Sequence, residues 1–418
     1  MPAEGASTAS PPAAALNARA AWAMVLALCA GVALSQAFRT VGAIMASPLQ
    51  AEFGLSPQAL GIFSGAFHFA FGAMQLFMGI GIDLHGVRRT VLVAFPVAIA
   101  GALLSALSSN YLVLVLAQAL IGVGCAPAFL VCTVFIARHF PAERFATVSG
   151  LVLAIGGLGM LVTGTPLAWL VQAHSWRAGF VLLALAAALA WLAIWHWVRE
   201  PAAAVPARRE SVPEAIRQFG ALLMLRHTLG IVVLGGVTYA AFISLRGLWL
   251  GPLMIERHGF SLVQSGNVAL AVSVISLVGA PLFGRLDSTD PAARRRRIVL
   301  WALAYTGLFA LIAFVHSAWL DIAGMLLIGL LSGFIVWQYA DVRGAYPAAL
   351  TGRAMAVFTM AMFMGVALMQ WGTGVAASVA AAHGGDPLTA VLATIAVLLL
   401  AGIAAFAWLP APTAKPRS

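Results

Sequence analysis

Two arginines lie inside long apolar segments of this 418-residue chain. At the centre of a membrane helix an arginine costs about 2.5–3.5 kcal/mol on insertion scales, so such a residue is a candidate functional group. Arg39 shares a helix face with Gln36, and Arg246 shares one with Tyr239 and Trp249. Two guanidinium groups that face one another across a cavity bind an anion from both sides, because their planar donors match carboxylate and phosphate oxygens. We therefore predict an anion-binding site formed by these five residues.

A structural interpretation of the two arginines stays open. Both lie nearer one end of their segments than the middle, and a long arginine side chain can extend to the lipid headgroups. Glu52 and Glu256, in the adjoining loops, are the carboxylates with which they could pair.

A second polar face runs along the next apolar segment, where His68 and Gln75 lie at helical spacing. We predict that both residues, together with Gln370 from a later segment, add hydrogen bonds to the same site. Histidine takes up protons near physiological pH, so His68 is a candidate for proton coupling. The alternative is that His68 is an ordinary hydrogen-bonding packing residue.

The sequence lacks the residues that cation binding, a carboxylate proton relay or enzymatic catalysis would need. No carboxylate lies at the centre of an apolar segment, so a cation site and an Asp/Glu proton relay have no candidate. Met360 and Met364 could offer thioethers to Cu(I), but methionine also fills apolar cores. We find no nucleophile triad, phosphate-binding Gly loop or metal-ligand cluster. We predict that the chain is not an enzyme and holds no cofactor or metal.

Composition shows what must surround these residues. Apolar residues make up 62% of the chain, charged residues 9%, and the mean hydropathy is +0.99. A soluble domain has about 25% charged residues, so this composition excludes a water-soluble protein. The net charge of +10 does not indicate nucleic acid, because the arginines lie in loops between apolar segments.

The chain divides into twelve apolar segments, each long enough to cross a bilayer, and this pattern predicts an all-α membrane protein with two six-helix bundles. We expect a disordered tail at 1–19, bundles at 20–198 and 228–409, a linker at 199–227 and a second tail at 410–418. The predicted spans are Ala20–Met45, Gln58–Ile80, Thr90–Ser108, Tyr111–Ile136, Thr147–Val171, Ala178–Val198, Thr228–Met254, Val263–Gly284, Ile298–Ser317, Trp319–Ala340, Ala354–Val379 and Pro387–Leu409.

Loop charges orient the predicted bundle. Nineteen of the 23 Lys and Arg residues fall on one side, and only Arg177 and Arg257 fall on the other. Positive loops stay in the cytoplasm, so we predict an inner-membrane protein with both termini cytoplasmic.

The two halves also repeat. Phe53-Gly54-Leu55-Ser56 and His258-Gly259-Phe260-Ser261 follow the first and seventh spans at an offset of 205 residues. Gly61 and Gly266 keep this offset, and Asp83 and Asp287 are 204 residues apart. These matches in register predict parallel six-helix repeats.

The loop after the second span, Gly79 to Arg89, resembles the G-x-x-x-D-R-x-G-R-R/K motif of the major facilitator superfamily. Gly79, Asp83, Gly86 and Arg88 match, whereas Leu84 replaces the usual Arg. Asp287 belongs to a weaker second copy, in which the Gly is missing. The resemblance covers essentially the full chain and implies that these five matching residues form a conformational latch. The alternative is that the arginines only fix the topology.

Paired arginines in the first and seventh helices resemble the organophosphate:phosphate antiporter branch, in which one Arg from each half binds phosphate. The string from Leu245 to Pro252 is similar to the seventh helix of that branch. Gln118 stands where many proton-driven drug exporters of the superfamily carry an Arg, and this departure disfavours a drug/proton antiporter.

These observations together predict a secondary transporter that moves a small organic anion by rocker-switch alternating access. Its partners would be the anion, a coupling ion or counter-anion, and the lipid bilayer; nucleic acid is not expected, and the family implies a monomer. Two alternatives stay open: proton-coupled efflux of a neutral or hydrophobic compound, and a transporter-like membrane sensor.

Overall fold

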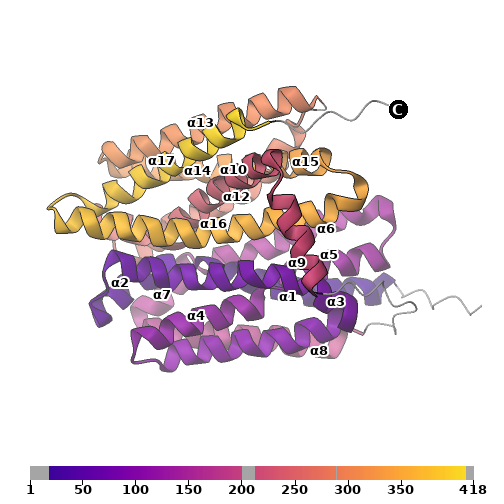
Figure 1. Ribbon diagram of the computed structural model, residues 1–418. Helices are drawn as coiled ribbons and strands as arrows, with labels where there is room; N and C mark the ends of the chain where they lie inside the picture. The colour runs from indigo at the N-terminus through magenta and orange to yellow at the C-terminus, as the bar shows by residue number, and fades with distance from the viewer. Residues whose placement is uncertain (1–17, 200–211, 289, 411–418) are drawn as a thin grey trace, which may run out of the picture.

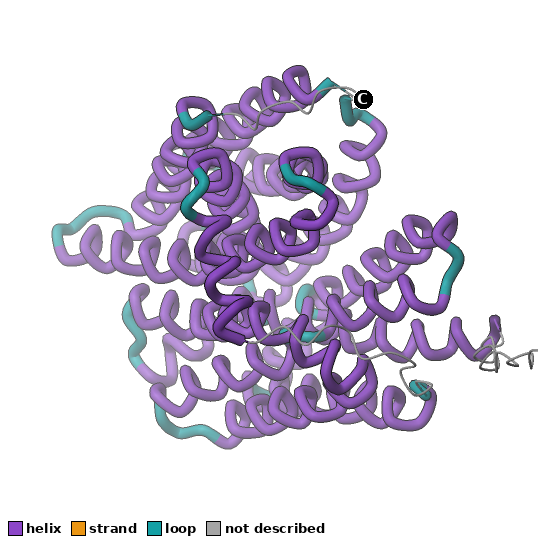
Figure 2. The backbone as a smooth tube through the Cα atoms, turned by 45° about the vertical axis from the view of Figure 1, so that its right-hand side comes forward, coloured by secondary structure: helices purple, strands orange, loops and turns teal. Residues whose placement is uncertain are grey.

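The computed structural model describes residues 18–199, 212–288 and 290–410, and the described residues form helices and connecting turns without a strand (Figure 1). The predicted tails, 1–19 and 410–418, lie almost entirely outside this part. Two halves pack side by side, one built from α1–α8 and the other from α10–α17, as Figure 2 shows from a second direction.

The first half contains eight helices because several predicted spans are interrupted. Its elements are α1 Ala18–Thr40, α2 Gly42–Phe53, α3 Pro57–Leu107, α4 Tyr111–Cys125, α5 Ala128–His139, α6 Ala142–Val162, α7 Thr165–Ala173 and α8 Trp176–Trp197.

The second half follows a short helix, α9, and its first span changes from α-helical to π-helical hydrogen bonding twice. Its elements are α9 Val212–Leu223, α10 Arg226–Ser244, the π-helix η1 Leu245–Trp249, α11 Leu250–Pro252, the π-helix η2 Leu253–Arg257, α12 Leu262–Arg285, α13 Pro291–Phe314, α14 Ala318–Leu331, the 3₁₀ helix η3 Ser332–Phe334, α15 Ile335–Ala345, α16 Ala348–Ala382 and α17 Pro387–Trp408.

Eleven helical stretches of the described chain are long and apolar enough to cross a membrane. The remaining predicted span, Gln58–Ile80, lies in the first part of α3, and the span that follows it occupies the second part. Gly86 separates the two parts with φ 78° and ψ 171°, a backbone conformation that favours glycine. The latch-motif glycine is thus the point at which the chain turns between two spans.

The first span was predicted to end at Met45. In the structure α1 ends at Thr40, and after a turn at Val41 a second helix, α2, runs to Phe53, where Gly54 ends it in the left-handed conformation at φ 62°. The polar residues after Met45 broke the apolar pattern, but they did not break the helix.

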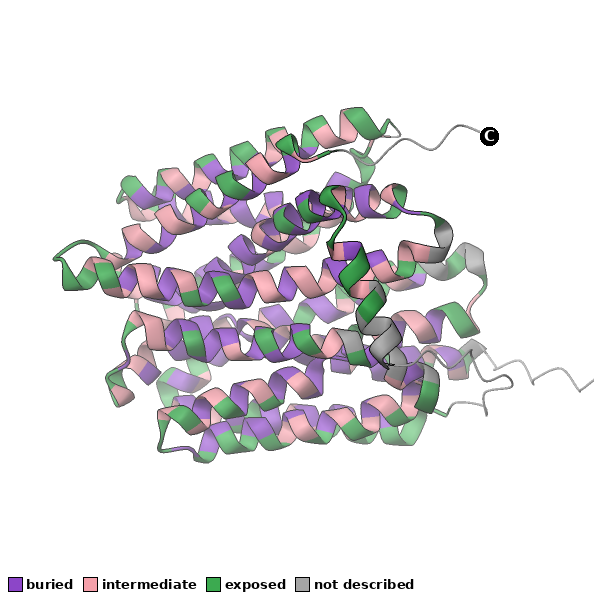
Figure 3. Ribbon diagram, in the orientation of Figure 1, coloured by how far each residue is buried: buried purple, intermediate pink, exposed green. Residues whose placement is uncertain are grey.

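The predicted linker includes α9, which lies across one end of the bundle (Figure 1) and contacts α3 of the first half and α16 of the second. We call this end, where α5, α9 and α15 lie, the basic end, because it is the side to which the sequence assigns most arginine-bearing loops. Exposed large apolar side chains, such as Leu116, Leu189 and Val397, lie along the helices, as expected for a lipid-facing surface. Figure 3 shows that exposed residues alternate with buried ones along these helices.

The repeat extends to individual contacts near the basic end. Arg88 donates a 2.9 Å hydrogen bond to the carbonyl oxygen of Trp195. Arg295 donates one of 3.2 Å to the carbonyl of Phe406 and stacks on that ring. In each half, therefore, an arginine at the start of the third span binds the end of the sixth.

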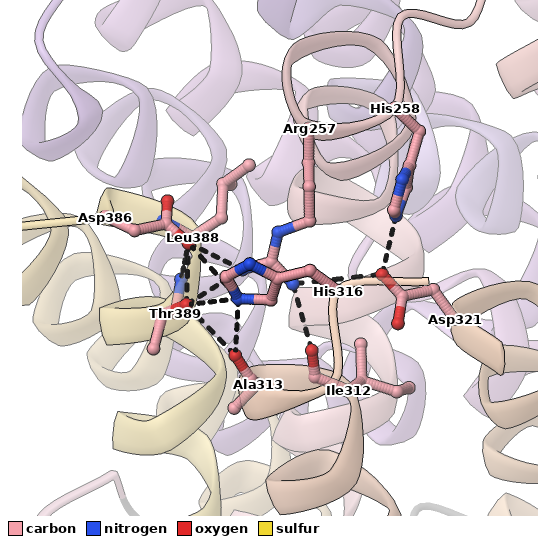
Figure 4. A network of polar contacts seen from close by, with 9 residues as sticks. All are labelled: Arg257, His258, Ile312, Ala313, His316, Asp321, Asp386, Leu388 and Thr389. Atoms are coloured by element: carbon pink, nitrogen blue, oxygen red, sulfur yellow. Dashed lines mark hydrogen bonds and ion pairs between the residues drawn. The ribbon is translucent and has the colours of Figure 1, made fainter. Parts of the chain in front are cut away.

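At the opposite end the repeated contact has its charges exchanged. Glu52 accepts a 2.6 Å bond from Arg177 in the first half, whereas Arg257 donates a 2.8 Å bond to Asp386 in the second. The second pair is extended by buried Asp321, whose carboxylate lies 2.7 Å from His258 and 3.8 Å from Arg257 (Figure 4). Both pairs hold the end of a first span against the start of a sixth.

Candidate functional site

Arg39 lies near the end of α1, at the boundary between the halves. One terminal nitrogen (NH1) donates a 2.9 Å hydrogen bond to the hydroxyl of Tyr239, and the other (NH2) lies 3.3 Å from the Ser35 hydroxyl. The guanidinium carbon lies 5.0 Å from the ring centre of Phe71 and 4.5 Å from that of Phe363. Both rings stabilise the cation through their π faces. The Nε atom has no hydrogen-bond partner among the described residues.

Arg246 lies in the π-helix η1 and is completely buried. Its Nε donates a 2.8 Å bond to the Ser273 hydroxyl, and one terminal nitrogen (NH2) donates one of 2.8 Å to the carbonyl of Met160. The same nitrogen lies 3.5 Å from Thr163, whose hydroxyl is 2.7 Å from that of Thr40. The other terminal nitrogen (NH1) has no partner in the described part of the chain.

The two arginines make reciprocal contacts across the boundary. Arg39 of the first half binds Tyr239 of α10, and Arg246 of the second half binds Met160 of α6. The predicted arrangement, in which both guanidinium groups face a shared cavity, is therefore not the arrangement seen here. In this conformation Arg246 joins the two halves.

Neither guanidinium has a carboxylate partner among the described residues. Glu52, one of the acidic residues considered for this pairing, binds Arg177 and the indole N–H of Trp176 instead. A buried cation without a counter-charge is energetically costly unless an anion approaches it. The site therefore has an uncompensated positive charge.

A cavity of about 160 Å³ lies beside these contacts, on the side toward the basic end. Gln36 and Tyr239, two of the predicted site residues, line it. Met160, the backbone partner of Arg246, belongs to the same wall. The remaining walls come from α10, α12 and the α14–α15 junction, so both halves enclose the cavity.

His68 and Gln370 lie near the aromatic rings that hold Arg39. The ring of His68 stacks beside Phe363 at 6.4 Å, and its Nδ1 lies 3.1 Å from the carbonyl of Ser64. Gln370 lies beside His68, and both side chains are buried. The Nε2 of His68 and both amide atoms of Gln370 have no hydrogen-bond partner among the described residues. The two side chains lie next to one another, beside the rings that hold Arg39.

Two predicted site residues, Gln75 and Trp249, form hydrogen bonds with residues of their own half. The Gln75 amide donates a 3.1 Å bond to the carbonyl of Ala126, and the Trp249 indole donates one of 2.9 Å to the Thr373 hydroxyl. Neither residue lines the cavity. Both connect neighbouring helices in this structure.

The predicted latch is only partly described. The side chain of Asp83 and the surroundings of Gly79 lie outside the described part of the structure. Gly86 supplies the turn within α3, and Arg88 binds Trp195. Asp287 forms an ion pair of 2.7 Å with Arg294 in its own loop.

Sequence reasoning missed several contributors to this site. Phe71 shares a helix face with His68, and this spacing was the only hint that it lies near Arg39. Phe363, Ser273 and Met160 had no such indication, because each is an ordinary residue of an apolar helix. Met160 contributes through its backbone carbonyl, which a sequence pattern does not reveal.

Curated relatives give a consistent but partial match. A probable sulfoacetate transporter of Cupriavidus necator is 22% identical over 285 residues, which cover 65% of this chain and 66% of the relative. A hexuronate transporter of Bacillus subtilis is 26% identical over 159 residues, covering 38% and 37%. An MFS-type efflux pump of Mycolicibacterium smegmatis is 29% identical over 302 residues, covering 68% and 66%. The chain therefore spans less than two thirds of the length of the first two relatives.

Solved structures share the fold at low sequence identity. The crystal structure of the nucleoside transporter NupG superimposes with a TM-score of 0.74 at 13% identity, covering 92% of this chain and 99% of that one. The sequence pattern that defines the Major Facilitator Superfamily matches residues 26–370 of this chain. Together with the two repeated halves, this match shows that the chain is a multi-pass membrane protein that belongs to the Major Facilitator Superfamily.

Proposed function

We propose that this protein is a secondary active transporter that moves a small organic anion across the inner membrane by alternating access. Membership of the superfamily supports transport, and relatives named as sulfoacetate and hexuronate transporters support an anionic substrate. The coupling partner is a counter-anion or an ion or proton gradient, and both termini are cytoplasmic.

The observation that carries this proposal is the uncompensated charge of Arg39 and Arg246. Arg246 is completely buried, and neither arginine has a carboxylate partner among the described residues. Each also keeps one guanidinium nitrogen that has no hydrogen-bond partner within the described part of the chain. A bound anion would provide a counter-charge, and in this conformation it would meet Arg39, which is less buried than Arg246. A neutral substrate would leave the positive charge uncompensated.

Alternating access requires that the contacts between the halves break and re-form. The halves touch closely at the end opposite the basic end, where a Cβ at Gly42 would lie 2.7 Å from the carbonyl oxygen of Gly247. The backbone N–H of Gln58 also donates a 3.0 Å bond to the Ser378 hydroxyl there. Opening toward that end would separate these pairs, together with Arg39–Tyr239 and Arg246–Met160. At the basic end, Asp83 and Arg88 would form the opposing latch.

The proposal is tested by uptake of labelled organic anions into proteoliposomes. Arg39→Gln should abolish uptake, because it removes the cation while leaving a polar side chain in its place. Arg343→Gln changes an exposed arginine of α15 and is the matched control that should retain uptake. Equal uptake by the two variants would show that Arg39 does not bind the substrate.

A second candidate is efflux of a neutral or hydrophobic compound. The mostly apolar wall of the cavity favours it, and one relative is named as an efflux pump. Inhibition of uptake by excess anion, but not by neutral analogues, would exclude this candidate. Ligand binding without any flux would instead indicate a sensor.

A further inference from the structure

The cavity beside Arg39 and Tyr239 limits the size of what it can hold. Its volume is about 160 Å³. An engineered apolar cavity of about 150 Å³ in another protein binds benzene. A group of roughly six to eight non-hydrogen atoms therefore fills this space, and a larger substrate would extend through the open side of the cavity.

The cavity wall is mostly apolar. It is formed chiefly by Met160, Phe242, Ile243, Leu277, Phe334 and Ile335, and no described residue that lines it is charged. Such a wall favours an apolar group, because burial of apolar surface contributes about 25 cal/mol per Å².

The hydroxyl groups of the wall already have acceptors. Ser276 donates a 2.8 Å bond to the carbonyl of Ser273, and Ser332 donates one of 2.7 Å to that of Gly329. Thr238 donates one of 2.8 Å to the carbonyl of Leu234. A polyhydroxylated substrate would find no free hydroxyl donor among these residues, and buried polar groups without partners are costly. The wall therefore disfavours sugar-like molecules.

Free polar groups gather at one end of the cavity. The Tyr239 hydroxyl accepts a bond from Arg39 and makes no other hydrogen bond in the described structure, so its proton is available to an acceptor in the cavity. The Gln36 side-chain amide also lines the cavity and makes no hydrogen bond to a described residue; its N–H groups, rather than its Oε1, would donate to an anion. Arg39, next to both, provides one positive charge.

The charge of Arg246 is less accessible than that of Arg39. Arg246 has no exposed surface, and its Nε and one terminal nitrogen are bonded to Ser273 and Met160. An anion in this conformation therefore meets one guanidinium, which suits a single negative charge better than a phosphate dianion.

We propose that the substrate is a monoanion with a compact apolar body, such as an aromatic or branched carboxylate or sulfonate. Its anionic group is bound by Tyr239, Gln36 and Arg39, and its apolar body fills the cavity. This inference rests on the proposed transport of organic anions and narrows the substrate to molecules that are polar at one end only.

Calorimetric titration of the detergent-purified protein with four probes tests this inference. Phenylacetate has one charge and a benzene-sized body, phenylacetamide is its neutral analogue, glucuronate is a polyhydroxylated carboxylate, and glucose 6-phosphate is a sugar phosphate. We expect phenylacetate to bind at least tenfold more tightly than each of the other three. Tighter binding of glucuronate or glucose 6-phosphate would overturn the inference but leave anion transport intact. Equal binding of phenylacetate and phenylacetamide would contradict the proposed anion function itself.

Two variants on α12 test whether the preference for phenylacetate arises from the wall of the cavity. Ala280 lines the cavity, whereas Ala271, on the same helix, is exposed at the outer surface. Ala280→Ser adds a hydroxyl to the wall and should weaken phenylacetate binding three- to tenfold, with Ala271→Ser as the unchanged control. Ile335→Asn, a larger change on the neighbouring wall formed by α15, should narrow the difference between phenylacetate and glucuronate. If phenylacetate does not bind, or if neither wall variant changes its affinity, the apolar body does not occupy this cavity and the inference fails.

Discussion

Arg39 of α1 and Tyr239 of α10 are joined by a 2.9 Å hydrogen bond that crosses the boundary between the two halves. This bond connects the cation that lacks a counter-charge to a residue that lines the cavity. Arg246 makes the reverse connection, from the second half to Met160 of the first. The groups available for an anion are therefore also groups that hold the halves together, which links ligand binding to the conformational change.

Tyr239→Phe removes the hydroxyl that accepts from Arg39 and keeps the ring. Hydrogen bonds to charged groups contribute about 1.5–3 kcal/mol, so we expect the dissociation constant for an anion to rise about tenfold or more. Tyr305→Phe is the matched control, because the buried hydroxyl of Tyr305 has no partner in the described structure. Calorimetric titration measures the affinity of both variants for the anion. Equal affinities would show that the Tyr239 hydroxyl does not contribute to anion binding.

Arg246→Met keeps an unbranched apolar chain but removes the guanidinium and its bonds to Ser273 and Met160. We expect the population that is open at the end opposite the basic end to increase, because one connection between the halves is lost. Spin labels at His174→Cys and Ser261→Cys, which lie on different halves at that end, report this opening as a longer distance. An unchanged distance distribution would show that Arg246 does not hold the halves together.

Gly251→Ala tests the close approach of the halves. A Cβ at Gly251 would overlap the carbonyl oxygen of Ala43, so the variant cannot close at this end without a backbone shift. We expect transport to fall at least tenfold while the protein stays folded. Gly307→Ala is the control, because a Cβ there meets nothing within 4 Å. Alanine is preferred to glycine in a helix, so this control should keep its activity and gain a little thermal stability.

The ion pairs Glu52–Arg177 and Arg257–Asp386 differ in burial, so they should contribute differently to the stability of the fold. The side chain of Arg257 is 6% exposed, against 36% for Arg177. Arg257→Gln leaves the fully buried Asp321 without its guanidinium neighbour and should lower the free energy of unfolding by about 3–5 kcal/mol. Arg177→Gln opens an exposed pair, for which about 1 kcal/mol or less is expected. Thermal unfolding compares the two, and equal losses would contradict this assignment.

The stability of the wild-type protein should depend on pH through Glu52. Hydrogen bonds from Arg177 and Trp176 lower the pKa of this carboxyl below its ordinary value. A lowered pKa in the folded state stabilises the fold above the unfolded pKa of about 4.3, and this contribution is lost as the pH falls through the folded pKa. Glu52→Gln should therefore be less stable than the wild type at pH 7, and the difference should shrink steadily below pH 4. A difference that stays constant with pH would exclude the ionised pair as its cause.

The sequence alone determined the class of protein, the repeated halves and the family. Lipid contact demands long apolar helices, and loop charge and motif spacing are local properties of a chain. The same reasoning identified Arg39 and Arg246 as exceptional, because a charge in an apolar segment is visible without any structure. It also placed Gln36 and Tyr239 on the faces that line the cavity.

Only the tertiary structure decided what each polar side chain contacts. Spacing placed Gln75 and Trp249 on the predicted faces, but Ala126 and Thr373 on neighbouring helices take their hydrogen bonds. The principal partner of Arg246 on the other half is a backbone carbonyl, and Arg39 lies between rings from two distant helices. The reason is physical: residue spacing fixes the face of one helix, whereas a side chain's partners depend on how several helices rotate and pack against one another.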